Sequence, residues 1–132
     1  LLLFIVIVNT ALVDIFAYII GSRYGKTPLR QNISPNKTLE GLFGGLLSSM
    51  AFIALLFIFI NLSSLMALMI LISSIFAFVG DYSISYLKRR SSIKDTGNIL
   101  PGHGGILDRV DSHLSAATIF TFLYIFIKTS GI

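Results

Sequence analysis

The fold is decided by residues 80–112, which read GDYSISYLKRRSSIKDTGNILPGHGGILDRVDS. This stretch holds five basic and four acidic residues, or nine of the chain's sixteen charged residues, although 55% of the chain is hydrophobic. Apolar segments precede and follow it, which makes it a polar island at one face of a membrane. Because lipid makes a buried charge costly, a mixed cluster of acids and bases at this place is a candidate functional site.

The apolar segments around this stretch predict an all-α, polytopic membrane helical bundle of about four transmembrane helices with two polar loops. A membrane-spanning helix needs ~20 mostly apolar residues. The four predicted spans cover residues 1–20, 41–60, 65–79 and 112–128. The third is short, but Asp81, Ser85 and Lys88 fall on one helical face, so we expect this helix to continue out of the membrane. Gly41 and Gly45 have the spacing of a close helix-packing face.

Charge in the loops predicts the orientation. Residues 21–40 carry four bases and one acid, residues 61–64 carry no charge, and glycines and prolines in residues 21–40 are expected to break regular structure. By the positive-inside rule, both charged loops face the cytoplasm. We therefore expect an integral protein of the inner (cell) membrane with its active site facing the cytoplasm. The net charge of +4 comes from bases placed between apolar segments, so membrane lipids rather than nucleic acid are the expected partners.

Length and composition set further bounds. A chain of 132 residues fits one domain, so residues 1–132 are expected to form a single transmembrane catalytic domain. The chain opens on Leu-Leu-Leu-Phe without an initiator methionine, which indicates a fragment of a longer protein. The absence of cysteine excludes disulfides and thiolate metal sites.

Asp14 is the one charged residue within the first predicted span. A carboxylate about two turns inside a membrane helix is costly unless it is paired or bound to a cation. We therefore expect Asp14 to face a polar cavity shared with Asp81, with Tyr18 beside it. The expected partners are a metal held by the other acids or a base such as Lys88.

Carboxylates beside several lysines and arginines are typical of a site that binds a hard cation and phosphates. Mg²⁺ takes oxygen ligands, often one or two carboxylates together with water and substrate phosphate. Asp108 and Asp111 are three residues apart and share a face if a helix begins there; Asp81 and Asp14 would complete the site. Neighbouring bases would neutralise charge on transferring phosphoryl oxygens. The residues alone predict Mg²⁺-dependent phosphoryl or nucleotidyl transfer at a membrane interface.

The two polar loops offer further contacts for phosphate. Lys37, with the hydroxyl and amide donors of residues 34–38, could hold phosphate oxygens. Gly104 and Gly105 allow close backbone approach to a ligand. His103 between these glycines could bind a metal, but local hydrogen bonding or contact with phosphate is favoured. Residues 21–27 nearly match a phosphate-binding loop, but that motif needs a preceding strand in an α/β sheet, so we reject it.

Three segments carry a resemblance to a known family. They read Ser85-Tyr-Leu-Lys-Arg, Lys94-Asp-Thr-Gly, and Leu100-Pro-Gly-His-Gly-Gly-Ile-Leu-Asp-Arg-Val-Asp111. This run is similar to the C-terminal signature of phosphatidate cytidylyltransferases (CDP-diacylglycerol synthases). Upstream, residues 34–41 resemble the family's second motif, and Asp14 with Ala17-Tyr18 resembles its Asp-Thr-Gly-Ala-Tyr segment. The resemblance covers nearly the whole chain, but only about the C-terminal half of a typical member.

This resemblance implies the reaction of CTP with phosphatidate to give CDP-diacylglycerol and pyrophosphate, with Mg²⁺ as cofactor, and it allows a homodimer. The implied catalytic residues are Asp81, Lys88, Arg89, Lys94, Asp108, Arg109 and Asp111. The substrate-binding residues are Ser34, Asn36, Lys37, Lys94, His103, Gly104 and Gly105. The metal ligands are Asp81, Asp108, Asp111 and Asp14. The chain departs from the family at Ile84, where glutamate is frequent, and at Ile15-Phe16, which replace Thr-Gly.

Several other functions are compatible with parts of the pattern. Within enzymes, the nearest are a CDP-archaeol synthase and a polyprenol kinase, both of which use CTP on a membrane lipid. A transport module would place its substrate site near the membrane midplane in broken helices, whereas the charges here gather at one face. A fragment that only packs against other subunits is the third alternative.

Overall fold

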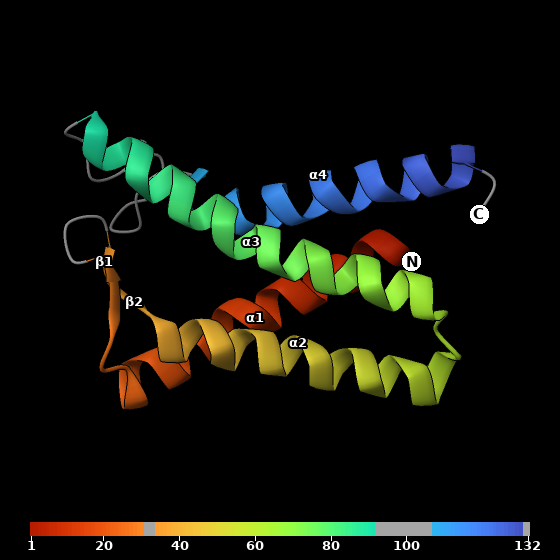
Figure 1. Ribbon diagram of the computed structural model, residues 1–132, viewed down its shortest axis with the longest axis horizontal. Coiled ribbons are helices and arrows are strands. Elements are labelled where there is room, and N and C mark those ends of the chain that lie inside the picture. The colour runs from red at the N-terminus through yellow and green to blue at the C-terminus, as the bar shows by residue number, and fades with distance from the viewer. Residues whose placement is uncertain (31–33, 92–106, 131–132) are drawn as a thin grey trace.

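The computed structural model describes residues 1–30, 34–91 and 107–130, and it describes side chains for residues 1–29, 37–91 and 110–130. Within these ranges, four long helices run up and down in a bundle (Figure 1). They are α1 (Leu2–Tyr24), α2 (Leu39–Ile60), α3 (Ser64–Arg90) and α4 (Leu107–Ser130). The predicted all-α bundle is therefore confirmed, and α3 continues as expected well past the end of its apolar segment.

All four helices are long and apolar enough to cross a membrane. Large apolar side chains point outward along them: Phe4, Ile58, Phe59 and Phe122 are 66%, 73%, 77% and 64% exposed. In water such a surface would be unstable, whereas the hydrocarbon of a bilayer covers it without cost. The chain is an integral membrane protein.

A two-stranded hairpin joins α1 to α2. Strands β1 (Pro28–Arg30) and β2 (Ser34–Thr38) pair antiparallel. Thr27 fixes the hairpin to the start of α2, because its carbonyl accepts from the Leu39 N–H at 3.0 Å and its own N–H lies 3.2 Å from a Glu40 carboxylate oxygen. The expectation of broken structure over residues 21–40 is thus wrong in two places: α1 continues to Tyr24, and backbone pairing orders the hairpin despite its prolines.

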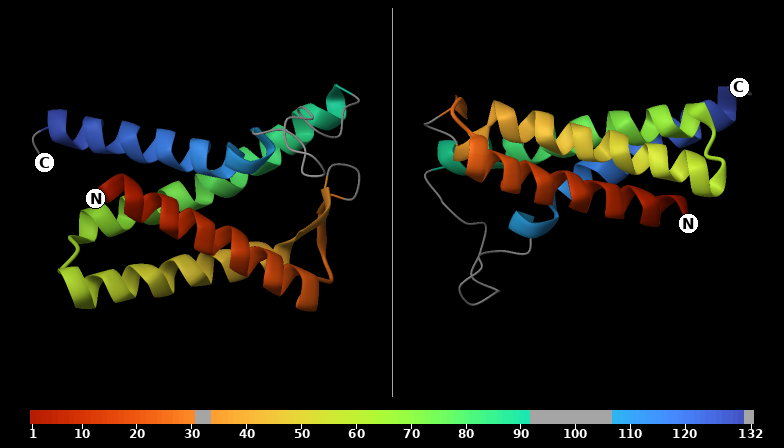
Figure 2. Two further views of the ribbon diagram at one scale, coloured as in Figure 1. Left: turned by 180° about the vertical axis from the view of Figure 1, so that it is seen from behind. Right: turned by 90° about the horizontal axis from the view of Figure 1, so that it is seen from below.

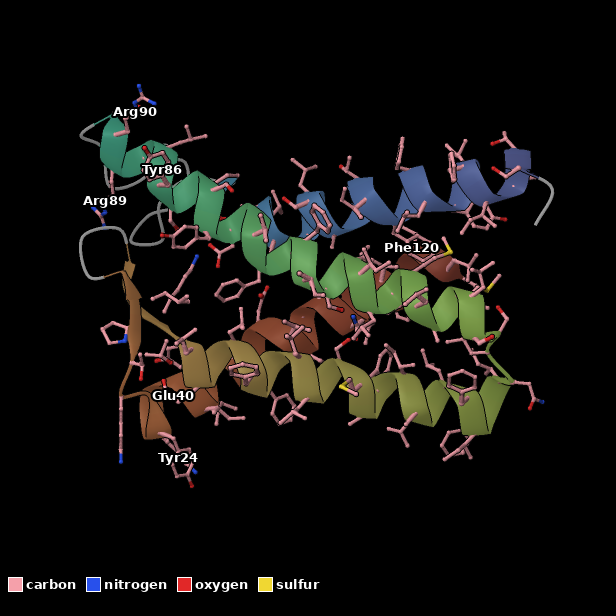
Figure 3. The ribbon with its side chains drawn as sticks, in the orientation of Figure 1. Tyr24, Glu40, Tyr86, Arg89, Arg90 and Phe120 are labelled. Atoms are coloured by element: carbon pink, nitrogen blue, oxygen red, sulfur yellow. The ribbon has the colours of Figure 1, made fainter. Side chains whose placement is uncertain are left out.

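The hairpin, the end of α1, the start of α2 and the end of α3 lie together at one end of the bundle, called the polar end here (Figures 1 and 2). Figure 3 shows Tyr24, Glu40, Tyr86, Arg89 and Arg90 at this end, with Phe120 far along α4. The hairpin and the charged end of α3 are therefore on one side of the bundle, as predicted, because an even number of spans separates them.

Glycines let the helices approach closely beside this end. A Cβ on Gly41 would lie 2.7 Å from the Ala17 carbonyl oxygen, and one on Gly45 would lie 2.9 Å from that of Val13. The predicted packing face on α2 is thereby confirmed, and its partner is α1. A Cβ on Gly80 would collide with the Ser115 side chain, so α3 and α4 also cross at a glycine, one residue before Asp81.

Candidate functional site

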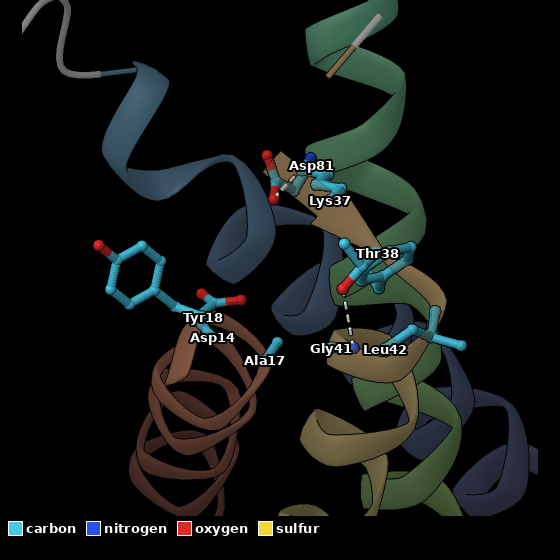
Figure 4. A pocket seen from close by; sticks show the side chains of 9 residues that line it. Asp14, Ala17, Tyr18, Lys37, Thr38, Gly41, Leu42 and Asp81 are labelled. Carbon is cyan, nitrogen blue, oxygen red and sulfur yellow. Dashed lines mark hydrogen bonds and ion pairs between the residues drawn. The ribbon is translucent and has the colours of Figure 1, made fainter. Parts of the chain in front are cut away.

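A cavity of about 240 Å³ opens at the polar end, between α1, β2, α2 and α3 (Figure 4). We call it the polar pocket. It is lined by Asp14, Ala17, Tyr18, Lys37, Thr38, Gly41, Leu42, Phe78 and Asp81. Pockets for drug-sized molecules usually occupy roughly 300–1,000 Å³, so the described walls enclose room for a phosphate-bearing head group rather than for a whole nucleotide.

Lys37 lies on one wall of the polar pocket and contacts three residues of α3. Its ammonium is 2.7 Å from the Asp81 carboxylate, 3.4 Å from the Ser85 hydroxyl and 5.9 Å from the centre of the Phe78 ring. The two charged side chains are only 17% and 32% exposed. Partial burial strengthens the attraction between them, so this ion pair joins β2 to α3.

The position of Lys37 follows from the local sequence. Thr38 caps α2, since its hydroxyl accepts a hydrogen bond from the Gly41 N–H at 3.1 Å. Threonine suits this position because its side chain pairs an N–H group that the first helical turn leaves unbonded. The cap fixes where β2 ends and α2 begins, and it thereby aims the preceding Lys37 across the pocket to α3.

Asp14 faces the bundle interior from α1. The Ser112 hydroxyl donates a hydrogen bond to its carboxylate at 2.7 Å, and the Ser112 N–H lies 2.8 Å from the Asp111 carboxylate. Ser112 on α4 thus connects two acids from different helices. Asp81 and Lys37 lie within electrostatic reach of both Asp14 and Asp111, so three carboxylates and one ammonium gather around this end of the bundle.

This geometry agrees with the expectation that Asp14 shares a cavity with Asp81, and Tyr18 lies at the pocket rim, 74% exposed. The partner of Asp14 differs from the expectation: it is the Ser112 hydroxyl. The base paired with Asp81 is Lys37. Lys88 and Arg89 occupy the last turn of α3, and each makes interactions of its own.

For the remaining predicted site residues, the structure describes the backbone alone or does not describe the residue. Four lie in described backbone whose side chains are not described: Ser34 and Asn36 in β2, and Asp108 and Arg109 at the start of α4. Four lie outside the described residues: Lys94, His103, Gly104 and Gly105. Their proposed roles stay predictions.

Sequence reasoning missed Ser112, Phe78 and the contact between Lys37 and Ser85. Ser112 could have been suspected, because it directly follows Asp111 and a hydroxyl is a natural partner for a carboxylate in an apolar span. Phe78 could not have been predicted, because it is one of several phenylalanines in apolar helices. Only the fold shows that a lysine lies near its ring.

The carboxylates have the chemistry that a Mg²⁺ site requires. Mg²⁺ prefers oxygen ligands and is usually held by one or two protein carboxylates, with water and substrate phosphate completing its shell. The described side chains include no group of three or more potential ligands close enough to hold a metal ion among themselves. Asp14, Asp81 and Asp111 come from three helices and surround one region, so the donor set fits a metal that shares its ligands with a substrate.

Fold and site together define a class: a polytopic membrane protein with an acidic, lysine-containing pocket at one membrane face. Residues 1–127 match the cytidylyltransferase family. The chain belongs to this family.

Curated relatives agree with this assignment. The chain is 46% identical over 117 residues to a phosphatidate cytidylyltransferase of Staphylococcus haemolyticus, covering 86% of this chain and 45% of that protein. It is 42% identical over 113 residues to that of Bacillus subtilis, covering 83% and 42% respectively. The chain therefore spans less than half the length of these relatives.

A solved structure shares the fold. It is described as "Structural insight into an intramembrane enzyme for archaeal membrane lipids biosynthesis" and matches with a TM-score of 0.70 over 90% of this chain and 75% of its own, at 22% sequence identity. At this identity the likeness concerns the arrangement of helices.

Proposed function

We propose that this chain forms the catalytic part of a phosphatidate cytidylyltransferase, which converts CTP and phosphatidate to CDP-diacylglycerol and pyrophosphate. The observation that carries the proposal is the meeting of Asp14, Lys37 and Asp81 in one pocket at a membrane face, in a chain of the cytidylyltransferase family. A site at the end of a membrane bundle can receive a water-soluble nucleotide and a lipid phosphate together. Its volume of about 240 Å³ suits the reacting phosphates, with the rest of each substrate outside it.

The reaction needs positioning and charge neutralisation more than covalent help from the protein. A phosphate oxygen of phosphatidate attacks the α-phosphorus of CTP, a new O–P bond forms, and the bond from that phosphorus to the bridging oxygen of pyrophosphate breaks. The attacking phosphate is already an anion, so no side chain has to accept a proton before attack. The pocket would hold the two phosphates in line, and this orientation would account for most of the acceleration of the reaction.

Positioning and charge neutralisation would come from the acids and the lysine around the polar pocket. One or two of Asp81, Asp111 and Asp14 would hold Mg²⁺ together with substrate phosphate, and Asp108 is expected beside them. The metal, when bound, would supply positive charge to the phosphates and to the leaving pyrophosphate. Ser112 orients the Asp14 carboxylate through its 2.7 Å hydrogen bond. Lys37 has an ammonium at the pocket wall and contacts triphosphate oxygens, with Lys94 expected to approach from the other loop.

The orientation and assembly of the protein complete the proposal. The basic residues of the polar end, among them Arg23, Lys26 and Arg90, support an orientation with this end on the cytoplasmic side of the inner (cell) membrane. CTP then reaches the pocket from the cytosol and phosphatidate from the bilayer. A homodimer stays a prediction, which mass measurement in nanodiscs can test.

The deciding experiment uses the full-length protein, purified in detergent and supplied with labelled CTP and phosphatidate. The expected product is CDP-diacylglycerol, identified by its mass, together with one pyrophosphate per turnover and with loss of activity in EDTA. Conversion of an archaeal ether lipid or of a polyprenol, with phosphatidate left unused, would contradict the proposal and identify the true acceptor. Asp81→Asn is the matched inactive control, since it keeps the shape of the side chain and removes its charge.

A further inference from the structure

Three buried polar side chains, each from a different helix, meet in the apolar interior of the bundle. Asn9 of α1, Ser49 of α2 and Ser74 of α3 are all 0% exposed. The Asn9 amide nitrogen donates to the Ser74 hydroxyl at 2.6 Å, and the Ser49 and Ser74 hydroxyls lie 2.9 Å apart. We call these three residues the polar hub. It lies among apolar core residues, away from the polar pocket, whose lining includes none of the three.

Ser74 is the centre of the polar hub. Its hydroxyl also lies 2.9 Å from the Ile70 carbonyl oxygen, to which it donates. Since its single proton is used there, the Ser49 hydroxyl must donate to Ser74, which therefore accepts two hydrogen bonds and donates one. All hydrogen-bonding positions of the Ser74 hydroxyl are therefore used. Its bonds to Asn9 and Ser49 form only when α1 and α2 have one particular orientation relative to α3.

The polar hub is not the most stable filling for this place. The Asn9 side-chain oxygen is buried and has no hydrogen-bond partner among the described residues, and an unpaired buried acceptor is destabilising. Hydrogen bonds between membrane helices add little net stability, so an apolar residue at position 9 would avoid the penalty. The polar side chains instead restrict how the three helices are oriented, because apolar packing alone lets helices rotate and slide more freely.

Two of the three helices joined by the polar hub carry the acids of the polar pocket, and the third begins directly after the strand that carries its lysine. Ser74 precedes Asp81 by seven residues, which is about two turns and ~10.5 Å along the same face of α3. Ser49 lies on α2, whose first residue follows directly on Thr38, the neighbour of Lys37. Asn9 lies on α1 with Asp14. The rotation and height of α3 at Ser74 therefore set where Asp81 meets the other two.

We propose that Asn9, Ser49 and Ser74 are positioning residues, which fix the rotation and height of α3 so that Asp81 meets Lys37 and shares the polar pocket with Asp14. The catalytic consequence rests on the proposed function; the positioning of α3 does not.

The chain supplies matched controls. Ser73 is also 0% exposed, and among the described residues its hydroxyl bonds only to the Ile70 carbonyl of its own helix, at 2.7 Å. Thr10 is 1% exposed and bonds to the Val6 carbonyl of its own helix at 2.9 Å. Ser73→Ala and Thr10→Val therefore delete a buried hydroxyl at the same depth without breaking a link between helices. They are compared with Ser74→Ala and Asn9→Leu.

Two measurements on the full-length protein in nanodiscs test the proposal. Spin labels at exposed sites on α1 and α3, Tyr24→Cys and Leu87→Cys in a background without other cysteines, report the distance between the polar ends of these helices. Turnover with CTP and phosphatidate, and the Mg²⁺ concentration for half-maximal activity, report the site. Ser74→Ala should shift or broaden the distance distribution, lower kcat by about 10- to 100-fold and raise the Mg²⁺ requirement, while KM for phosphatidate changes little.

Asn9→Leu should give the same changes, with thermal stability equal to that of the wild type or higher, and it replaces Ser74→Ala if that variant does not insert. Ser73→Ala and Thr10→Val should leave distance, kcat and Mg²⁺ requirement within twofold of the wild type. Equal effects of Ser73→Ala and Ser74→Ala on distance and rate would overturn the positioning role. A wild type that forms no CDP-diacylglycerol would refute the proposed function, and the label distances would then decide the positioning role alone.

Discussion

Replacement of Lys37 by methionine tests how the polar pocket is held together, because it removes the ammonium and keeps an unbranched side chain. Asp81 then loses the cation at 2.7 Å from its carboxylate. Exposed ion pairs contribute ~0–1 kcal/mol, and breaking a fully buried pair costs ~3–5 kcal/mol. With side-chain exposures of 17% and 32%, this pair falls between these limits, so Lys37→Met should lower the free energy of unfolding by about 1–2 kcal/mol.

The same variant should weaken catalysis through a separate contact. Hydrogen bonds to a charged group contribute ~1.5–3 kcal/mol, and ~1.4 kcal/mol is a factor of ten. If Lys37 also contacts the triphosphate, kcat/KM for CTP should fall about 10- to 100-fold, with less change in KM for phosphatidate. Lys26→Met, at an exposed position of the same loop, is the matched control and should alter neither quantity.

The assay combines unfolding of the detergent-solubilised protein by SDS with steady-state kinetics, in a cycle of Lys37→Met, Asp81→Asn and the double variant. Because the double variant leaves no unpaired charge, Asp81→Asn should be less destabilising in the Lys37→Met background, with a coupling of about 1 kcal/mol. Strict additivity of the three unfolding free energies would refute the ion pair as a structural link. Unchanged CTP kinetics in Lys37→Met would refute its role toward the nucleotide.

Three further variants test the neighbouring contacts. Asp111→Asn should abolish turnover while the protein still inserts and folds, and near-normal activity across a Mg²⁺ titration would contradict its role as a ligand. Gly80→Ala should lower the free energy of unfolding by about 1–3 kcal/mol, because its Cβ meets the Ser115 side chain; combining it with Ser115→Gly should restore much of this loss, and no rescue would place the strain elsewhere. Thr38→Val should destabilise the protein by about 1 kcal/mol through loss of the helix cap, whereas Thr38→Ser, which keeps the hydroxyl, should stay close to the wild type in the same SDS titration.

The helices were predictable because length and apolarity are properties of single segments. Asp14 was predictable for a related reason: the cost of a charge in lipid requires a polar environment wherever the helix packs. The extension of α3 to Arg90 followed from the helical spacing of Asp81 and Ser85. In each case the physical constraint acts on residues close together in the sequence.

The features that the sequence did not reveal depend on contacts that the pattern of side chains does not report. The pairing of β1 with β2 depends on backbone groups, which the side-chain pattern around Pro28 does not report. The bond from Ser112 to Asp14 joins residues 98 positions apart, and many serines of this chain could have supplied it. The polar hub could not be predicted for the same reason. Ser73 and Ser74 are adjacent residues of the same type, and only the rotation of α3 decides which of them bonds to Asn9.

The length of α3 ties the site to the thickness of the bilayer. Its 27 residues extend ~40 Å, against a hydrocarbon core of ~30 Å, and Asp81 lies ~25 Å from its first residue. The acid therefore sits near the boundary between acyl chains and head groups. Lipids with longer acyl chains would draw Asp81 into hydrocarbon or force the helix to tilt, and shorter ones would expose it to water. Under the proposed function, the enzyme would then respond to the membrane that its own products build.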